Sequence, residues 1–150
     1  MQRVDKNVLV PFTPIDMYRL VDHIEQYAQF LPWCRASHEA NRTPDSVLGT
    51  LQIEVHGLKH TFTTRNQLSP PSSIHMTLVE GPFSELSGNW EFQAIGPDAC
   101  KIRLWLQYRF ASRLLETVIG PVFNRIAATL VDAFVAEAHR RYRPQQSLAG

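Results

Sequence analysis

The feature that most constrains this chain is a change in the spacing of its apolar residues towards the C-terminal end. Between residues 34 and 112 apolar and polar side chains alternate, most clearly from residue 102 to residue 110. From residue 114 to residue 142 apolar residues instead recur at every fourth position from Val118 onwards, which is close to the period of a helix. The apolar stripe of this helix is broader than that of a surface helix, so we expect a sheet to cover it.

The N-terminal segment predicts one strand and two short helices. Residues 2–10 are rich in valine and partly alternate, as in a strand. Thr13 and Pro14 indicate a helix start, because threonine caps a helix and proline fits the first helical position. A second helical turn that carries Tyr27 ends before Pro32, since proline disfavours helical backbone in the residue that precedes it.

Turn residues divide the alternating region into six strands. Every connection between two strands is short, which favours an antiparallel meander. We therefore expect an α+β fold of the helix-grip type, in which a curved antiparallel sheet of about seven strands wraps around the long C-terminal helix. Two short helices follow the first strand and close one end. The turn residues lie at positions 43–45, 56–57, 69–72, 80–82 and 96–98.

The long helix contains one interruption. Gly120 and Pro121 should either kink the helix or mark its true start, because proline cannot donate a backbone hydrogen bond. We expect one domain over residues 1–143 and a frayed C-terminal tail over residues 144–150.

Composition limits the partners and the compartment. The 150 residues suit one domain, and 15 basic against 14 acidic residues leave a formal net charge of +1. No overall field would therefore draw the chain onto DNA or an anionic membrane. No stretch approaches the roughly 18 apolar residues of a membrane span, so we expect a cytoplasmic protein with peripheral membrane contact at most. Cys34 and Cys100 have neither metal-ligand spacing nor a disulfide framework.

Short motifs occur in a specific order from about Val4 to about Tyr142. They lie at residues 8–12, 17–21, 30–34, 62–68, 80–83, 88–92, 99–102 and 121–123. In this order they resemble the coenzyme Q-binding and RatA-type proteins of the START-like superfamily, and residues 62–68 (FTTRNQL) resemble the bacterial RatA branch in particular. One departure is Ala28, which stands where the family usually has proline.

The resemblance implies a START-type helix-grip fold with an apolar cavity. It also implies two activities. One is binding the quinone or isoprenoid tail of ubiquinone in support of respiration. The other belongs to a toxin that binds the large ribosomal subunit and blocks its association with the small subunit. An older name for such sequences, polyketide cyclase/dehydrase, adds an enzymatic alternative.

The inward positions of the strands and the helix are the candidate ligand-binding residues. The same side chains would form an ordinary filled core, and the sequence leaves both interpretations open. A sheet that grips one helix leaves wedge-shaped space, and aromatic residues with polar tips suit its walls. The candidates are Phe62, Met76, Leu78, Trp90, Phe92, Leu104, Leu106, Tyr108, Phe123, Ile126, Leu130 and Phe134.

The chain lacks the residue patterns of a catalytic site. His56 and His60 flank a turn, but a metal site would want a third ligand in register. His60 shares a strand face with Phe62, so it lies either in the cavity or at the strand end. No nucleophile elbow or phosphate-binding glycine loop is present. We therefore expect a non-catalytic protein that requires no cofactor or metal. The resemblance implies that its ligand is ubiquinone or another isoprenoid lipid.

A ribosome-binding surface would need clustered basic residues with exposed aromatic side chains. The last strand and the start of the long helix supply Arg103, Trp105, Arg109 and Arg113. Arginines further along the helix could equally serve solubility and the helix dipole. Arg65, in the RatA-like motif, could face solvent or be buried at the sheet edge. Further candidates on the helix are Arg125, Arg140 and Arg141.

Overall fold

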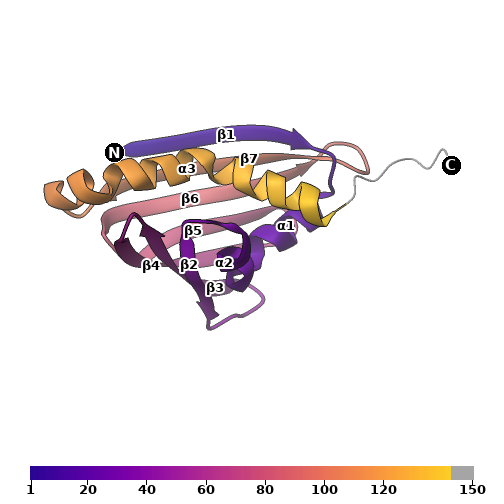
Figure 1. The fold of residues 1–150 in the computed structure, drawn as a ribbon. Coiled ribbons are helices and arrows are strands. Elements are labelled where there is room, and N and C mark those ends of the chain that lie inside the picture. Colours follow the sequence, from indigo (N-terminus) through magenta and orange to yellow (C-terminus); the bar gives the residue numbers. More distant parts are fainter. Residues whose placement is uncertain (143–150) are drawn as a thin grey trace.

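Seven antiparallel strands form one curved sheet around a long helix in the computed structural model, which describes residues 1–142 (Figure 1). Spatial order is β1-β7-β6-β5-β4-β3-β2, so β2 to β7 form a meander and β1 pairs with β7. The expected tail over residues 144–150 lies outside the described residues. The strands are β1 (Gln2–Val10), β2 (Cys34–Ala40), β3 (Ser46–Val55), β4 (Leu58–Ser69), β5 (Ser73–Glu80), β6 (Phe83–Ala94) and β7 (Cys100–Phe110).

The helices follow the predicted order. After β1 come α1 (Pro14–Asp22), a 3₁₀ turn η1 (Ile24–Gln26) and α2 (Tyr27–Phe30); α3 (Arg113–Arg141) follows β7. Thr13 caps α1 as predicted, since its hydroxyl accepts a hydrogen bond from the backbone N–H of Asp16 at 3.3 Å. Figure 1 shows α3 lying across one face of the sheet, with α1 and α2 at one end.

The start of α3 decides between the two interpretations of Gly120 and Pro121. Ser112 is the N-cap, and its hydroxyl accepts a hydrogen bond from the N–H of Leu115 at 3.1 Å. Pro121 lies inside the helix, so the interpretation that the helix begins there is wrong. Proline at this position leaves the carbonyl of Thr117 without its usual helical N–H partner.

The curvature of the sheet has local causes. Irregularities in strand pairing lie near Cys34, Thr63 and Phe83, and such bulges bend and twist a sheet. Gly88 is needed on β6 because a Cβ there would lie 2.9 Å from the carbonyl oxygen of Trp105 and 3.1 Å from Met76 Cε. The bulges and this close approach let neighbouring strands curl towards α3.

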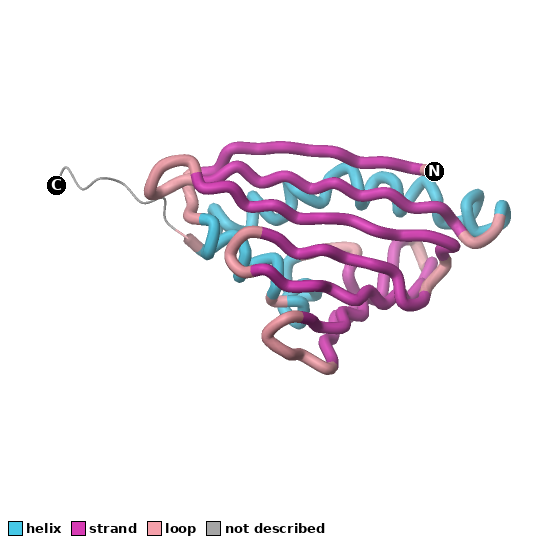
Figure 2. Tube along the Cα trace, turned by 180° about the vertical axis from the view of Figure 1, so that it is seen from behind, coloured by secondary structure: helices cyan, strands magenta, loops and turns pink. Residues whose placement is uncertain are grey.

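No helix of residues 1–142 covers the outer face of the sheet, as Figure 2 shows from behind. The inner face is covered by α3, which is also tied to β1 by an ion pair between Lys6 and Asp132 at 2.8 Å. α3 is long and apolar enough to cross a membrane by length and composition alone, so the expectation that no stretch approaches a membrane span is wrong. The packing of α3 against the sheet accounts for this composition, because a core helix needs the same residues.

Candidate ligand-binding cavity

A cavity lies between α3 and the inner face of the sheet, where residues of β3 to β7 line it. The space open to the centre of a water molecule is about 80 Å³. A single water needs only about 10–15 Å³ by this measure, whereas pockets for drug-sized ligands span roughly 300–1,000 Å³. As it stands, the cavity therefore suits a small ring rather than a long chain.

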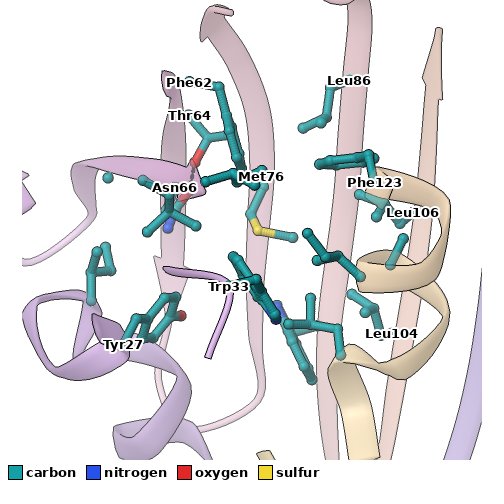
Figure 3. Close-up of a pocket in the computed structure, with 18 of the residues that line it drawn as sticks. Tyr27, Trp33, Phe62, Thr64, Asn66, Met76, Leu86, Leu104, Leu106 and Phe123 are labelled. Atoms are coloured by element: carbon teal, nitrogen blue, oxygen red, sulfur yellow. Dashed lines mark hydrogen bonds between the residues drawn. The ribbon is translucent and has the colours of Figure 1, made fainter. Parts of the chain in front are cut away.

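Nine of the twelve candidate residues line this cavity. They come from four strands and from one face of α3, so the alternation and the four-residue period do bring their side chains together. Most are buried, and their side chains surround the space drawn in Figure 3. The nine are Phe62, Met76, Trp90, Leu104, Leu106, Phe123, Ile126, Leu130 and Phe134.

The other three candidates do not line the cavity. Leu78 packs into the core near the β5–β6 turn, and Phe92 lies behind Trp90, with the two rings parallel and 6.2 Å apart. Tyr108 is 1% exposed and contacts the rings of Phe83 and Phe123. These strand positions face inwards as predicted, but at their ends of the sheet neighbouring side chains fill the space.

Ten lining residues were not among the candidates. Three come from the segment between α1 and β2, whose place in space an alternation pattern cannot reveal. The strand residues among them could have been found, because Thr64 and Asn66 share the inward face of Phe62 in the sequence pattern. The ten are Ile24, Tyr27, Trp33, Gly49, Leu51, Ile53, Thr64, Asn66, Leu86 and Ala127.

One polar pair interrupts the apolar wall. Thr64 and Asn66, both 7% exposed, lie two residues apart on β4, and the Thr64 hydroxyl donates a hydrogen bond to Asn66 Oδ1 at 2.7 Å. Figure 3 shows this bond, with the amide nitrogen of Asn66 turned away from Thr64. Within residues 1–142 that nitrogen has no hydrogen-bond partner.

A glycine helps to leave room beside this pair. Gly49 on β3 is the register partner of Thr64 and lines the cavity. A Cβ at this position would lie 2.9 Å from Ile24 Cδ1, so any other residue would force the Ile24 side chain to shift. The absence of a side chain at residue 49 lets Ile24 and Tyr27 close the cavity from the helical side.

The cavity adjoins an outer groove. Trp33 and Ile126 line both spaces, so the indole of Trp33 stands between the interior and the groove. Trp33 is held in the segment before β2, where its carbonyl accepts a hydrogen bond from the N–H of Glu54 at 2.9 Å. The groove is lined by Pro32, Trp33, Glu54, Val55, His56, Pro121, Val122, Arg125, Ile126 and Thr129.

The cavity wall carries little acid–base chemistry. Among the described residues that line it, none is a carboxylate, histidine, lysine, arginine or cysteine. Tyr27 donates its hydroxyl hydrogen to the carbonyl of Val21, and burial raises the pKa of this phenol far above its usual value. Thr64 and Asn66 do not titrate near neutral pH. Among the residues of 1–142 that line the cavity, none is therefore suited to general acid or base catalysis near neutral pH.

The remaining reactive side chains lie elsewhere. His60 is near the start of β4 and borders a small pocket of about 20 Å³, not the main cavity. Cys34 and Cys100 are buried and unpaired, and burial raises the pKa of each thiol to about 11. Within residues 1–142 no three histidine, cysteine or acidic side chains are grouped to hold a metal ion.

The candidate ribosome-binding residues do not form one uncompensated basic patch. Arg103 lies 2.9 Å from Asp5 and 3.8 Å from Glu91, and Arg109 is paired in register with Glu85. Trp105 is half-buried on this outer face, while Arg113 is exposed at the start of α3. Arg65 is exposed, so its interpretation as a buried residue is wrong.

The arginines at the end of α3 have a structural partner. Arg140 and Arg141 both donate to Glu137, which is 5% exposed, and Arg140 does so at 2.6 Å. Arg141 also lies over the ring of Phe30, 5.3 Å from its centre. Arg141 therefore ties the C-terminal end of α3 to α2, whereas Arg140 pairs within α3.

Fold and cavity together define a helix-grip protein with an apolar interior. Residues 10–135 match the family described as polyketide cyclase / dehydrase and lipid transport. The chain belongs to this family, in the branch that includes ribosome association toxins and coenzyme Q-binding proteins.

Two curated relatives carry these names. The chain is 39% identical over 142 residues to "Ribosome association toxin RatA" of Escherichia coli (strain K12), covering 95% of this chain and 90% of the relative. It is 27% identical over 144 residues to "Coenzyme Q-binding protein COQ10, mitochondrial" of Drosophila melanogaster, covering 93% of this chain and 59% of that protein.

A solved structure gives the same architecture. The Zhui aromatase/cyclase from Streptomyces sp. R1128 superimposes with a TM-score of 0.78 at 20% identity, over 99% of this chain and 98% of that one. At this identity the similarity concerns the fold alone. The predicted helix-grip fold is confirmed.

Proposed function

We propose that this protein binds a hydrophobic small molecule, ubiquinone or a related isoprenoid lipid, in the cavity between α3 and the sheet, without catalysis. The observation that carries the proposal is an apolar cavity whose wall holds one polar pair, Thr64 and Asn66, and no charged group among the described residues. Such walls bind neutral ligands and orient them through a few polar contacts.

The size of the cavity limits which part of such a ligand would lie inside it. About 80 Å³ of internal space accommodates a ring, so an isoprenoid tail would leave past Trp33 and Ile126 into the outer groove. Pro121 and Val122 give the groove an apolar side, against which a tail can pack. We propose a cytoplasmic location, with membrane contact limited to exchange of the ligand.

The test uses calorimetric titration with a short-tailed ubiquinone and a variant that fills the cavity. Ala127 is 2% exposed and lines the cavity, whereas its neighbour Ala128 is exposed on the same helix. Wild-type protein and Ala128→Leu should bind the quinone with a negative heat-capacity change, and Ala127→Leu should bind at least about tenfold more weakly. Equal binding by all three proteins would exclude the cavity as the site.

A second function is favoured by the 39% identity to the ribosome association toxin relative. We propose that the chain also associates with the large ribosomal subunit through the end of the molecule where β7 meets α3. Arg109 and Arg113 are exposed there, while Arg103 is neutralised by Asp5 and Glu91.

Co-sedimentation with purified large subunits tests this second function. Binding should strengthen as the salt concentration falls, because phosphate contacts release counterions. Arg109→Glu combined with Arg113→Glu should abolish it. Arg19→Glu on α1, at the opposite end of the sheet from the start of α3 (Figure 1), should cost much less. Absence of co-sedimentation at low salt would remove the proposal.

A further inference from the structure

The Thr64–Asn66 pair is incomplete as a hydrogen-bonding unit. The Asn66 side chain is only 7% exposed, and its amide oxygen accepts a hydrogen bond from the Thr64 hydroxyl. Both N–H groups of the amide remain without an acceptor within residues 1–142. This nitrogen is not among the fully enclosed unpaired side-chain atoms of residues 1–142, so it borders open space and can donate to an occupant of the cavity.

The hydrogen bond from Thr64 gives the amide a direction. A threonine hydroxyl can donate only one hydrogen, and here it is donated to Asn66 Oδ1. The nitrogen end of the amide is therefore the end left for the cavity, whose lining includes Tyr27, Trp33 and Met76 (Figure 3). Thr64 is a positioning residue for Asn66, and the cavity presents donors rather than acceptors at this point.

The other residues of the cavity wall restrict the chemical class of the ligand. No cationic side chain lines the cavity among the described residues, so a carboxylate or phosphate would be buried without a counter-charge. A hydrocarbon would leave the Asn66 N–H groups unpaired. The group that fits is a neutral acceptor on an apolar, ring-sized body.

We propose that Asn66 anchors the carbonyl oxygen of a neutral ring ligand of the quinone or aromatic ketone class, with Thr64 holding the amide in the donating orientation. The inference rests on the proposed ligand-binding function and assigns the contact that selects the ligand. The carbonyl accepts from Asn66 Nδ2, and the ring packs among Trp33, Met76 and Phe134.

Two matched probes separate carbonyl recognition from apolar fit. Duroquinone and durene both carry four ring methyl groups, but only duroquinone has carbonyl oxygens, and its substituted ring has no free position for thiol addition. Wild-type protein should bind duroquinone about tenfold more tightly than durene in calorimetric titration. Asn66→Leu should abolish this preference while binding durene at least as tightly as wild type.

Two further variants control for structural effects. Thr63→Val removes a hydroxyl from the neighbouring buried residue, which pairs with Thr50 at 2.8 Å and does not line the cavity. It should keep the full preference for duroquinone. Thr64→Val should lose part of the preference, and Thr64→Ser should restore it, because serine also donates to Asn66.

A spectroscopic measurement needs no variant. The infrared carbonyl stretch of bound duroquinone should shift to lower frequency than in an apolar solvent, as a hydrogen-bonded carbonyl does. Durene binding without a preference for duroquinone, or a preference that survives in Asn66→Leu, would overturn the anchor and leave the cavity proposal standing. Failure of wild-type protein to bind either probe would overturn both.

Discussion

Two polar pairs differ in what surrounds them under α3. On β7 the hydroxyl of Tyr108 donates to Asn124 Oδ1 of α3 at 2.5 Å, inside a cluster of aromatic rings. On β4 the Thr64 hydroxyl donates to Asn66, and the amide nitrogen of Asn66 has no partner in residues 1–142. The first pair joins sheet to helix, whereas the second lies within one strand and borders an open space.

The two pairs mark two regions under α3. We call the aromatic cluster around Tyr108 the filled end, and the region around the Thr64–Asn66 pair, which borders the cavity, the hollow end. At the filled end Phe83, Phe110 and Phe123 surround Tyr108 with ring centres 4.8–6.0 Å from it. At the hollow end the same sheet face carries Thr64, Asn66 and the side-chain-free Gly49. One face can therefore supply both the core that stabilises the fold and the site that binds.

The largest expected effect compares truncations at the two ends. Tyr108→Ala should lower the free energy of unfolding by about 3–5 kcal/mol, because it leaves a cavity in a packed cluster. Met76→Ala should cost only about 2 kcal/mol, since Met76 is half-buried and already borders empty space. Urea denaturation measures both, and equal losses would contradict the distinction between the ends.

Removal of the polar pairs should give effects of opposite sign. Asn124→Leu leaves the buried Tyr108 hydroxyl unpaired and should cost about 1–3 kcal/mol. The double variant Thr64→Val/Asn66→Leu removes both polar partners and should leave stability unchanged or raise it by up to about 1 kcal/mol. A loss of stability in the double variant as large as in Asn124→Leu would mean that the β4 pair is structural.

Alkaline pH should weaken the filled end. Burial raises the pKa of Tyr108 to about 12, from about 10 when unfolded. Below pH 10 both states keep the proton. Between pH 10 and 12 the unfolded state releases it first, so this contribution to stability falls as the pH rises. Tyr108→Phe should lose less stability than wild type over this window, and identical pH profiles would contradict the assignment.

The smallest effect is expected at the surface. The ion pair between Lys6 and Asp132 joins β1 to α3, but the Asp132 side chain is 65% exposed. Asp132→Ala should change the free energy of unfolding by less than about 1 kcal/mol, because solvent screens the pair and alanine favours the helix. A larger loss, measured in the same urea series, would mean that the surface contributes as much as the hollow end.

The sequence predicted the inner face better than its division into two ends. Alternation correctly placed Thr64 and Asn66 beside Phe62, and the four-residue period placed Phe123 and Phe134 on the inner side of α3. The sequence pattern could not show that Tyr108 is closely packed while Met76 borders the cavity. This difference depends on the bulges in the sheet and on where α3 crosses it. Trp33 escaped prediction because it lies outside any periodic element.

The distribution of tryptophans has a practical consequence. Trp33 and Trp90 line the cavity, while the third tryptophan, Trp105, lies on the outer face of β7. The protein thus contains two intrinsic fluorophores in contact with any occupant and a third that is remote from it. Quinones quench excited indoles on contact, so emission from this unlabelled chain would report occupancy directly, and a Trp105→Phe variant would remove the constant background.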